Sequence, residues 1–287
     1  MHAMDQARLS KLVRQHAQTS RLLGVDFVPA YSSAAEEGAM PPPMPNGTVP
    51  QPQSLGRGLF GAADETPPEV VVLPVGFKRP DRNPKSVQAK LDELRRRYEA
   101  DAPHQHFVTA HTNIVFGEGD PCAKLMFIGE APGAEEDRTG RPFVGRAGQL
   151  LNKMIAAMGL QREQVYIGNV LKTRPPDNAT PTTDEIKLCA PYLFEQIAII
   201  DPEVIVTLGL PATRAVLDSV DSMSRLRGRW SQFQAGAPSG RKIPVMPTYH
   251  PAFLLRSYTT ENRAKVWSDL QQVMTRLGLA TTGQKPD

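Results

Sequence analysis

From residue 124 onward, short apolar runs alternate with segments of helical periodicity. The apolar runs predict four β-strands, at 124–128, 165–170, 204–208 and 243–249. The intervening and following periodic segments predict helices at 146–158, 182–200, 210–217 and 261–277. Strands that alternate with helices pair in parallel, with helices on both faces of the sheet. We therefore predict an α/β protein, a three-layer α/β/α sandwich around a mainly parallel four-stranded sheet, with its site at the carboxyl ends of the strands.

The N-terminal part of the chain has a different pattern. An incomplete apolar stripe over 5–23 predicts an N-terminal helix, which we place within residues 1–28. Nine prolines fall within residues 29–68, so we predict a Pro-rich disordered linker over 29–85. A helix over 86–100 opens the folded domain, predicted to span 86–279, and a flexible tail follows at 280–287. Within the linker, residues 53–60 carry apolar side chains in a polar context, either as a docking motif for a repair or replication partner or by chance.

Composition excludes several classes of protein. The net charge of +3 is too small to indicate a nucleic-acid partner, so any such surface must be built locally. No segment approaches the roughly 20 consecutive apolar residues of a membrane span, and we expect no membrane association. Two cysteines, Cys122 and Cys189, cannot form a disulfide framework, which favours a reducing cytoplasm.

Three strand ends carry unusual residues. GEAPGAEED over 129–137 follows the first strand, Asn169 closes the second, and TYHPAFLLR over 248–256 follows the last. Taken singly, each has an ordinary structural interpretation: a solvated acidic loop, a turn residue and a structural histidine at His250. Because parallel strands end at one edge of their sheet, the three segments are expected to converge.

Together these segments resemble the uracil-DNA glycosylases, and most closely their family 4. The resemblance covers about residues 110–277, through GEAPGAEEDRTGRPFVGRAGQLL, YIGNVLKTRPPDN, VIVTLG and TYHPAFLLR. It implies a monofunctional hydrolase of base excision repair, which extrudes uracil from DNA, cleaves the N-glycosidic bond and leaves an abasic site. The implied partner is uracil-containing DNA, and we expect a cytoplasmic monomer.

The resemblance also implies roles for individual residues. The implied catalytic residues are Glu130, with Glu136 as a second candidate for the carboxylate that orients the water, and His250. The N–H of His250 would stabilise the departing uracil anion. The implied uracil-binding residues are Gly129, Gly133, Phe143, which stacks on the base, and Asn169, which reads its edge. The residues expected to contact DNA are Arg141, Arg146, Arg174, Leu254, Leu255 and Arg256, although the leucines are equally typical of helix-start core residues.

The chain departs from family 4 in its cysteines. Enzymes of that family hold a [4Fe–4S] cluster with four cysteines, of which this chain retains only Cys189; Thr173 stands at the third position and the upstream pair is absent. His104, His106 or His111 could join Cys189 on zinc only at a non-standard spacing. We therefore predict no metal and no cofactor.

Three alternatives to a uracil-DNA glycosylase remain. The first is a non-catalytic module that binds damaged DNA. The second is a glycosylase acting on another deaminated base, because Gly133 stands where family 1 enzymes place a bulky Tyr. The third is a nucleotide- or phosphate-binding α/β protein. The joint presence of Glu130, Asn169 and His250 argues against the first and the third alternative and leaves the second open.

Overall fold

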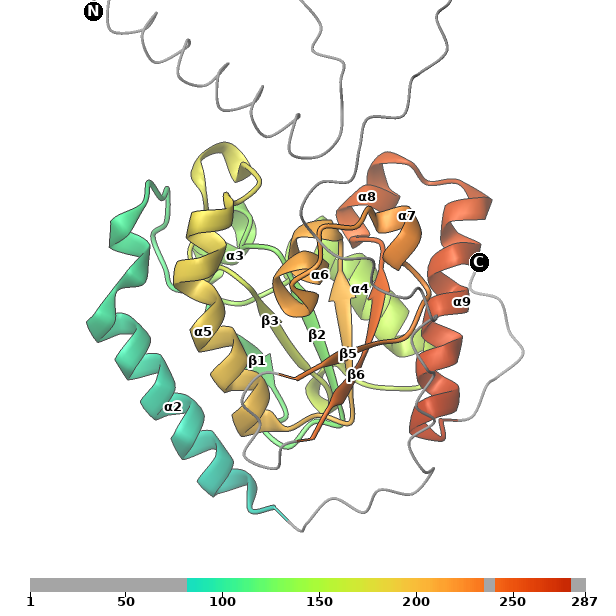
Figure 1. The fold of residues 1–287 in the computed structure, drawn as a ribbon, viewed down its shortest axis with the longest axis horizontal. Helices are drawn as coiled ribbons and strands as arrows, with labels where there is room; N and C mark the ends of the chain where they lie inside the picture. Colours follow the sequence, from blue (N-terminus) through green and yellow to red (C-terminus); the bar gives the residue numbers. More distant parts are fainter. Residues whose placement is uncertain (1–81, 235–240, 280–287) are drawn as a thin grey trace, which may run out of the picture. The chain divides into compact units, whose positions relative to one another are not determined.

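The computed structural model describes residues 82–234 and 241–279 (Figure 1). The predicted N-terminal helix, nearly all of the predicted linker with its segment 53–60, and the C-terminal tail lie outside the described residues.

The central sheet has six strands, in the order β1-β3-β2-β4-β6-β5. The strands are β1 (Glu118–Gly119), β2 (Leu125–Gly129), β3 (Tyr166–Asn169), β4 (Val204–Leu208), β5 (Ser231–Phe233) and β6 (Ile243–Thr248). The four predicted strands are confirmed as β2, β3, β4 and β6, and they pair in parallel. The predicted number of strands was too small, because β1 and β5 add antiparallel edges. These two strands are two and three residues long and lack the apolar run that marks the others.

Helices precede, connect and follow the strands. The α-helices are α2 (Pro84–Asp101), α3 (Ala134–Thr139), α4 (Arg146–Ala157), α5 (Thr183–Ile200), α6 (Leu210–Leu217), α7 (Met223–Leu226), α8 (Pro251–Arg256) and α9 (Thr260–Leu277). Short 3-10 helices are η1 (Pro103–His106), η2 (Arg162–Gln164) and η3 (Pro176–Asn178). The predicted start of α5 is confirmed: Thr182 Oγ1 accepts from the Glu185 amide, and the Glu185 carboxylate accepts from the Thr182 amide.

Two apolar cores, one on each face of the sheet, confirm the predicted three-layer sandwich. On one face, strand residues such as Phe127 pack with Leu151 of α4 and Leu270 of α9. On the other face, alternate strand residues such as Ile128 pack with α5, α6 and Leu91 of α2. Figure 1 shows α2 and α5 at one side of the domain and α9 at the other. No helix among the described residues is long and apolar enough to cross a membrane.

Candidate active site

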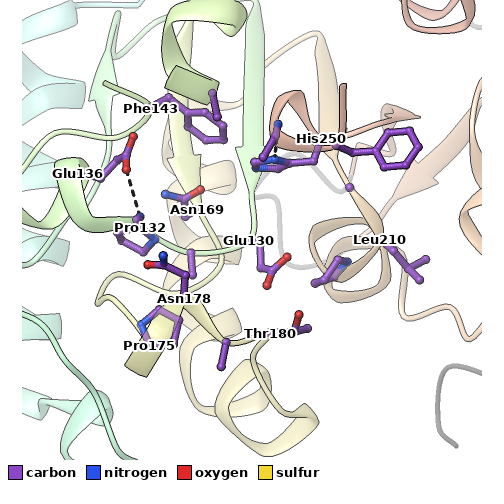
Figure 2. A pocket seen from close by; sticks show the side chains of 18 of the residues that line it. Glu130, Pro132, Glu136, Phe143, Asn169, Pro175, Asn178, Thr180, Leu210 and His250 are labelled. Carbon is purple, nitrogen blue, oxygen red and sulfur yellow. Dashed lines mark hydrogen bonds between the residues drawn. The ribbon is translucent and has the colours of Figure 1, made fainter. Parts of the chain in front are cut away.

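A cavity of about 630 Å³ opens at the carboxyl ends of the parallel strands (Figure 2). Seven of the residues singled out in the sequence line it together: Glu130, Gly133, Glu136, Phe143, Asn169, His250 and Arg256. They come from the segment after β2, the last residue of β3 and the segment after β6. The expected convergence of the three strand ends on one cavity is therefore confirmed, whereas the roles of these residues are taken up below.

Gly129 brings Phe143 and Asn169 together. The strand register places Gly129 directly opposite Asn169 in the β2–β3 pair. A Cβ atom at Gly129 would lie 2.4 Å from Oδ1 of Asn169 and 2.5 Å from Cζ of Phe143, closer than real Cβ contacts. Gly129 does not line the cavity itself, but the absence of its side chain makes room for the two side chains that do.

Asn169 is 1% exposed. Its Oδ1 atom is buried and has no hydrogen-bond partner among the described residues. Because a buried polar atom without a partner loses its hydration without compensation, it is expected to receive a hydrogen bond from a bound molecule. Asn169 therefore offers an unused acceptor at the cavity wall.

A buried lysine supports the backbone of Asn169. Lys172 has no exposed surface, and its Nζ donates to the Asn169 carbonyl oxygen at 2.7 Å and to the Gln196 side chain. Gln196 donates in turn to the Phe116 carbonyl oxygen at 2.9 Å. Burial disfavours the ammonium and lowers the pKa of Lys172 to about 7. Sequence reasoning missed this residue, since the lysine that opens the segment KTRPP is typical of an exposed loop.

His250 is the N-cap of α8, and its Nδ1 accepts from the Ala252 amide at 3.1 Å. Burial, with a smaller contribution from the charge of Arg256, lowers the pKa of His250 to about 4. The imidazole is therefore neutral at pH 7, and the bond to Nδ1 leaves the proton on Nε2. Its ring centroid lies 5.6 Å from that of Phe143. His250 thus presents a neutral N–H donor beside an aromatic ring.

Glu130 lines the cavity, and burial raises its pKa to about 7, partly opposed by a hydrogen bond from Thr180 and the charge of Arg256. A carboxyl group with a pKa near the working pH is suited to proton transfer and to orienting water. Figure 2 shows Thr180 close to Glu130.

Glu136, the second carboxylate, is bound to the backbone. It accepts from the amides of Gly133 at 3.2 Å, Val144 at 2.9 Å and Gly145 at 2.8 Å. A Cβ atom at Gly133 would lie 2.8 Å from Glu136 Oε2, so the absence of a side chain at Gly133 leaves room for the Glu136 carboxylate. Glu136 Oε1 thus holds the loop that carries Phe143, whereas Oε2 holds the start of α3, and the residue also lines the cavity.

The residues expected to contact DNA fall in different environments. Arg256 lines the cavity and Leu255 is 42% exposed. Leu254, in contrast, is 3% exposed and belongs to the core, so we withdraw it as a residue that enters DNA. Outside the cavity lining, Arg141 pairs with Glu118 at 2.8 Å, Arg174 binds Asn178 at 2.9 Å, and Arg146 is exposed on the first turn of α4.

Several cavity residues were not singled out in the sequence. They are Ala131, Pro132, Ala147, Pro175, Asn178, Ala179, Thr180, Gly209, Leu210, Pro211, Met223, Tyr249 and Ala252. Most lie within or directly beside the motifs quoted from the sequence, and that position was the only available signal. Leu210, Pro211 and Met223 come from the segments after β4, which carried no such motif.

Comparison with known proteins agrees with this arrangement. A family model described as the uracil DNA glycosylase superfamily matches residues 116–271. A type-4 uracil-DNA glycosylase from Thermotoga maritima is 45% identical over 162 residues, which cover 56% of this chain and 81% of the relative. One from Archaeoglobus fulgidus is 43% identical over 166 residues, covering 56% and 81%. A type-5 uracil-DNA glycosylase from Thermus thermophilus is 32% identical over 152 residues, covering 47% and 67%. The chain belongs to the uracil-DNA glycosylase superfamily.

Proposed function

We propose that this protein is a monofunctional uracil-DNA glycosylase of base excision repair, with the cavity described above as its active site. The observation that carries the proposal is the meeting of Glu130, Phe143, Asn169 and His250 on one cavity. An enzyme acting on a base in DNA must take the base out of the stack and read it in such a cavity.

Asn169 selects uracil by its hydrogen-bonding edge. Uracil carries an N3–H donor and an O4 acceptor, which match the oxygen and the amide N–H of an asparagine side chain. Cytosine carries an acceptor at N3 and a donor at N4, so both contacts would be mismatched in a buried site. The unpartnered Oδ1 of Asn169 supports this role, since uracil N3–H would supply its missing donor. Phe143 packs against the face of the base.

The bond between C1′ and N1 breaks with its electron pair going to uracil, which leaves as an anion while positive charge develops on the sugar. The Nε2–H of His250 donates to the uracil oxygen O2, where the negative charge accumulates. Glu130 in its ionised form supports the positive sugar and orients the water that adds to C1′, and accepts a proton from that water. Glu136 keeps the Phe143 loop in place, which is why we favour Glu130 as the catalytic carboxylate.

A [4Fe–4S] cluster of the kind typical of type-4 enzymes does not fit the residues around Cys189. Thr173, which replaces one thiolate, is fully buried, and the hydroxyl of Tyr98 lies against Thr173 and Cys189. Tyr98 has no exposed surface, and its ring packs with Tyr192, with centroids 5.0 Å apart. No group of three or more His, Cys, Asp or Glu side chains in the described parts of the chain could hold a metal ion. The protein acts without a cluster, and packing around Tyr98 stabilises this region.

DNA is held by Arg256 at the cavity and by Arg141, Arg146 and Arg174 near it, while Leu255 fills the space that the extruded base leaves. Residues 86–279 form the glycosylase domain, which acts as a monomer in the cytoplasm.

The proposal is tested with a labelled oligonucleotide that contains one uracil, incubated with the protein and a metal chelator and then treated with alkali. The wild-type protein is expected to give strand breaks at uracil. Asn169→Asp should lower the rate at uracil about 100-fold or more. It should also gain activity at cytosine, because a protonated carboxyl group can donate to cytosine N3 and accept from its N4 amino group. His250→Ala should lose about 100- to 1,000-fold. Uracil left intact by the wild-type protein would refute the proposal.

Two alternatives are decided by the same assay. Gly133 lines the cavity without a side chain, which favours a wider range of bases. Oligonucleotides that contain thymine or hypoxanthine in place of uracil therefore accompany the assay, and faster cleavage at hypoxanthine would reassign the substrate. Tight binding of uracil-containing DNA without strand breaks would identify a non-catalytic binding module.

A further inference from the structure

Phe143 has an unfavourable backbone conformation. Its φ angle is +50°, in the left-handed region that bulky side chains rarely adopt. Its carbonyl oxygen turns towards α4, where a Cβ atom at Gly148 would lie 1.9 Å from it. A bulky residue keeps such a conformation only where its surroundings hold it.

The guanidinium of Arg162 holds this backbone from the carbonyl side. Arg162, in η2 just before β3, donates to the Phe143 carbonyl oxygen at 3.1 Å and to that of Pro142. Its other donors bind Asn152 Oδ1 at 2.7 Å and the Glu118 carboxylate at 2.6 and 2.9 Å. Five hydrogen bonds thus use the full donor capacity of the guanidinium. Its side chain is only 13% exposed.

Glu118 fixes the guanidinium in turn. It lies on β1, which pairs with β3, the strand that ends at Asn169. Burial would raise the pKa of Glu118, but hydrogen bonds and charges from Arg141 and Arg162 lower it below its usual value. The carboxylate therefore stays ionised and orients the fork of Arg162 towards the loop.

The loop is thus held from two sides. Glu136 binds the amides of Val144 and Gly145, which follow Phe143. Arg162 binds the carbonyl groups of Pro142 and Phe143. All four contacts are made to backbone atoms, and none involves the Phe143 ring. Glu136 and Arg162 therefore fix the position of the ring through the backbone of the loop.

We propose that Arg162, oriented by Glu118, is a positioning residue that places the Phe143 ring against the extruded base. The inference rests on the proposed function. Lysine cannot replace this arginine, because an ammonium has no planar fork to reach two carbonyl groups and a carboxylate together. A displacement of about 1 Å at a catalytic site can lower a rate about 100-fold.

The test is a double-mutant cycle on single-turnover uracil release, with Arg162→Lys, Phe143→Leu and the double variant. Arg162→Lys is expected to lower the rate about 10- to 100-fold. In the Phe143→Leu background the same change should cost less than about threefold, because the residue acts through the aromatic ring. Equal losses in both backgrounds would overturn the proposal.

Arg241→Lys is the matched control. Arg241 is also 13% exposed, and it binds the Asp201 carboxylate at 2.6 Å and the Pro202 carbonyl oxygen at 2.7 Å, next to the amino ends of β4 and β6. This variant should lose comparable thermal stability and less than about twofold in rate. A loss in rate equal to that of Arg162→Lys would show that the effect is only structural. Should Arg162→Lys fail to fold, Glu118→Gln replaces it in the cycle, with the same expected coupling.

A second measurement separates this inference from the proposed function. Hydrogen exchange at the amides of Val144 and Gly145 should be at least about tenfold faster in Arg162→Lys and unchanged in Arg241→Lys. If the wild-type protein released no uracil, the proposed function would fail, and the exchange rates would still test whether Arg162 holds the loop. Unchanged exchange in Arg162→Lys would overturn the positioning role.

Discussion

Replacement of Glu130 by glutamine should make the protein more stable and inactive. Burial raises the pKa of Glu130 to about 7 from an ordinary value of 4.5. Between these two pH values the folded chain binds a proton that the unfolded chain has released, so the stability of the wild-type protein falls as pH rises. The fall is about 1.4 kcal/mol per pH unit at most. Because Glu130 lines the cavity and is only partly buried, we expect a total of about 1–3 kcal/mol.

Glutamine has nearly the same shape and no charge, so Glu130→Gln removes this penalty. Its free energy of unfolding should match that of the wild type at pH 4.5 and exceed it by about 1–3 kcal/mol at pH 8. Urea denaturation at both pH values measures the difference. Glu135→Gln is the control, since that side chain is 56% exposed and its replacement should change stability by less than about 0.5 kcal/mol at either pH. A gain in Glu130→Gln that is the same at both pH values, or no gain, would refute the reasoning.

Five further measurements follow from the site and the core. The kcat/KM of uracil release should rise about tenfold per pH unit below pH 7 and level above it, if ionised Glu130 is required; a flat profile from pH 5 to 8 would contradict this. Gly129→Ala should lower that rate at least about 100-fold, because its Cβ displaces two cavity side chains, and circular dichroism should remain unchanged. Arg256→Gln should remove about one phosphate contact, so the slope of log K for DNA binding against log salt concentration should become shallower by about one. Titrations at several salt concentrations measure this slope. Tyr98→Ala should lower the free energy of unfolding by about 3–5 kcal/mol in urea denaturation, because the side chain has no exposed surface. Elemental analysis of the purified wild-type protein should find no iron.

The sequence allowed prediction of the features that depend on local pattern and parallel topology. Continuous apolar runs identified the parallel strands, because strands buried on both faces require them. Once the strands were parallel, Glu130, Asn169 and His250 had to lie at one edge of the sheet, since each follows or closes a strand. The cavity was thus predictable without long-range information.

Features that depend on the angle of a side chain or on distant contacts were not predictable. Leu254 and Leu255 are adjacent on the short helix α8, and only tertiary packing decides that the first is buried and the second exposed. The positive φ of Phe143 has no sequence signal, since phenylalanine does not favour it. Arg162 reaches that backbone from 19 residues away along the chain, through a contact that no spacing rule describes.

The unfavourable features of the molecule are concentrated around the cavity. Phe143 has a positive φ, Asn169 keeps an unpartnered oxygen, and Glu130 and His250 are half-buried where their charged forms are disfavoured. Each reduces the stability of the free protein, and the cores on both faces of the sheet must offset that cost. An extruded uracil would supply the donor that Asn169 lacks and cover the Phe143 ring, while the departing anion would meet the uncharged N–H of His250. Because the Asn169 oxygen has no partner among the described residues before the base arrives, the hydrogen bond proposed for it would contribute to binding of the base rather than to folding.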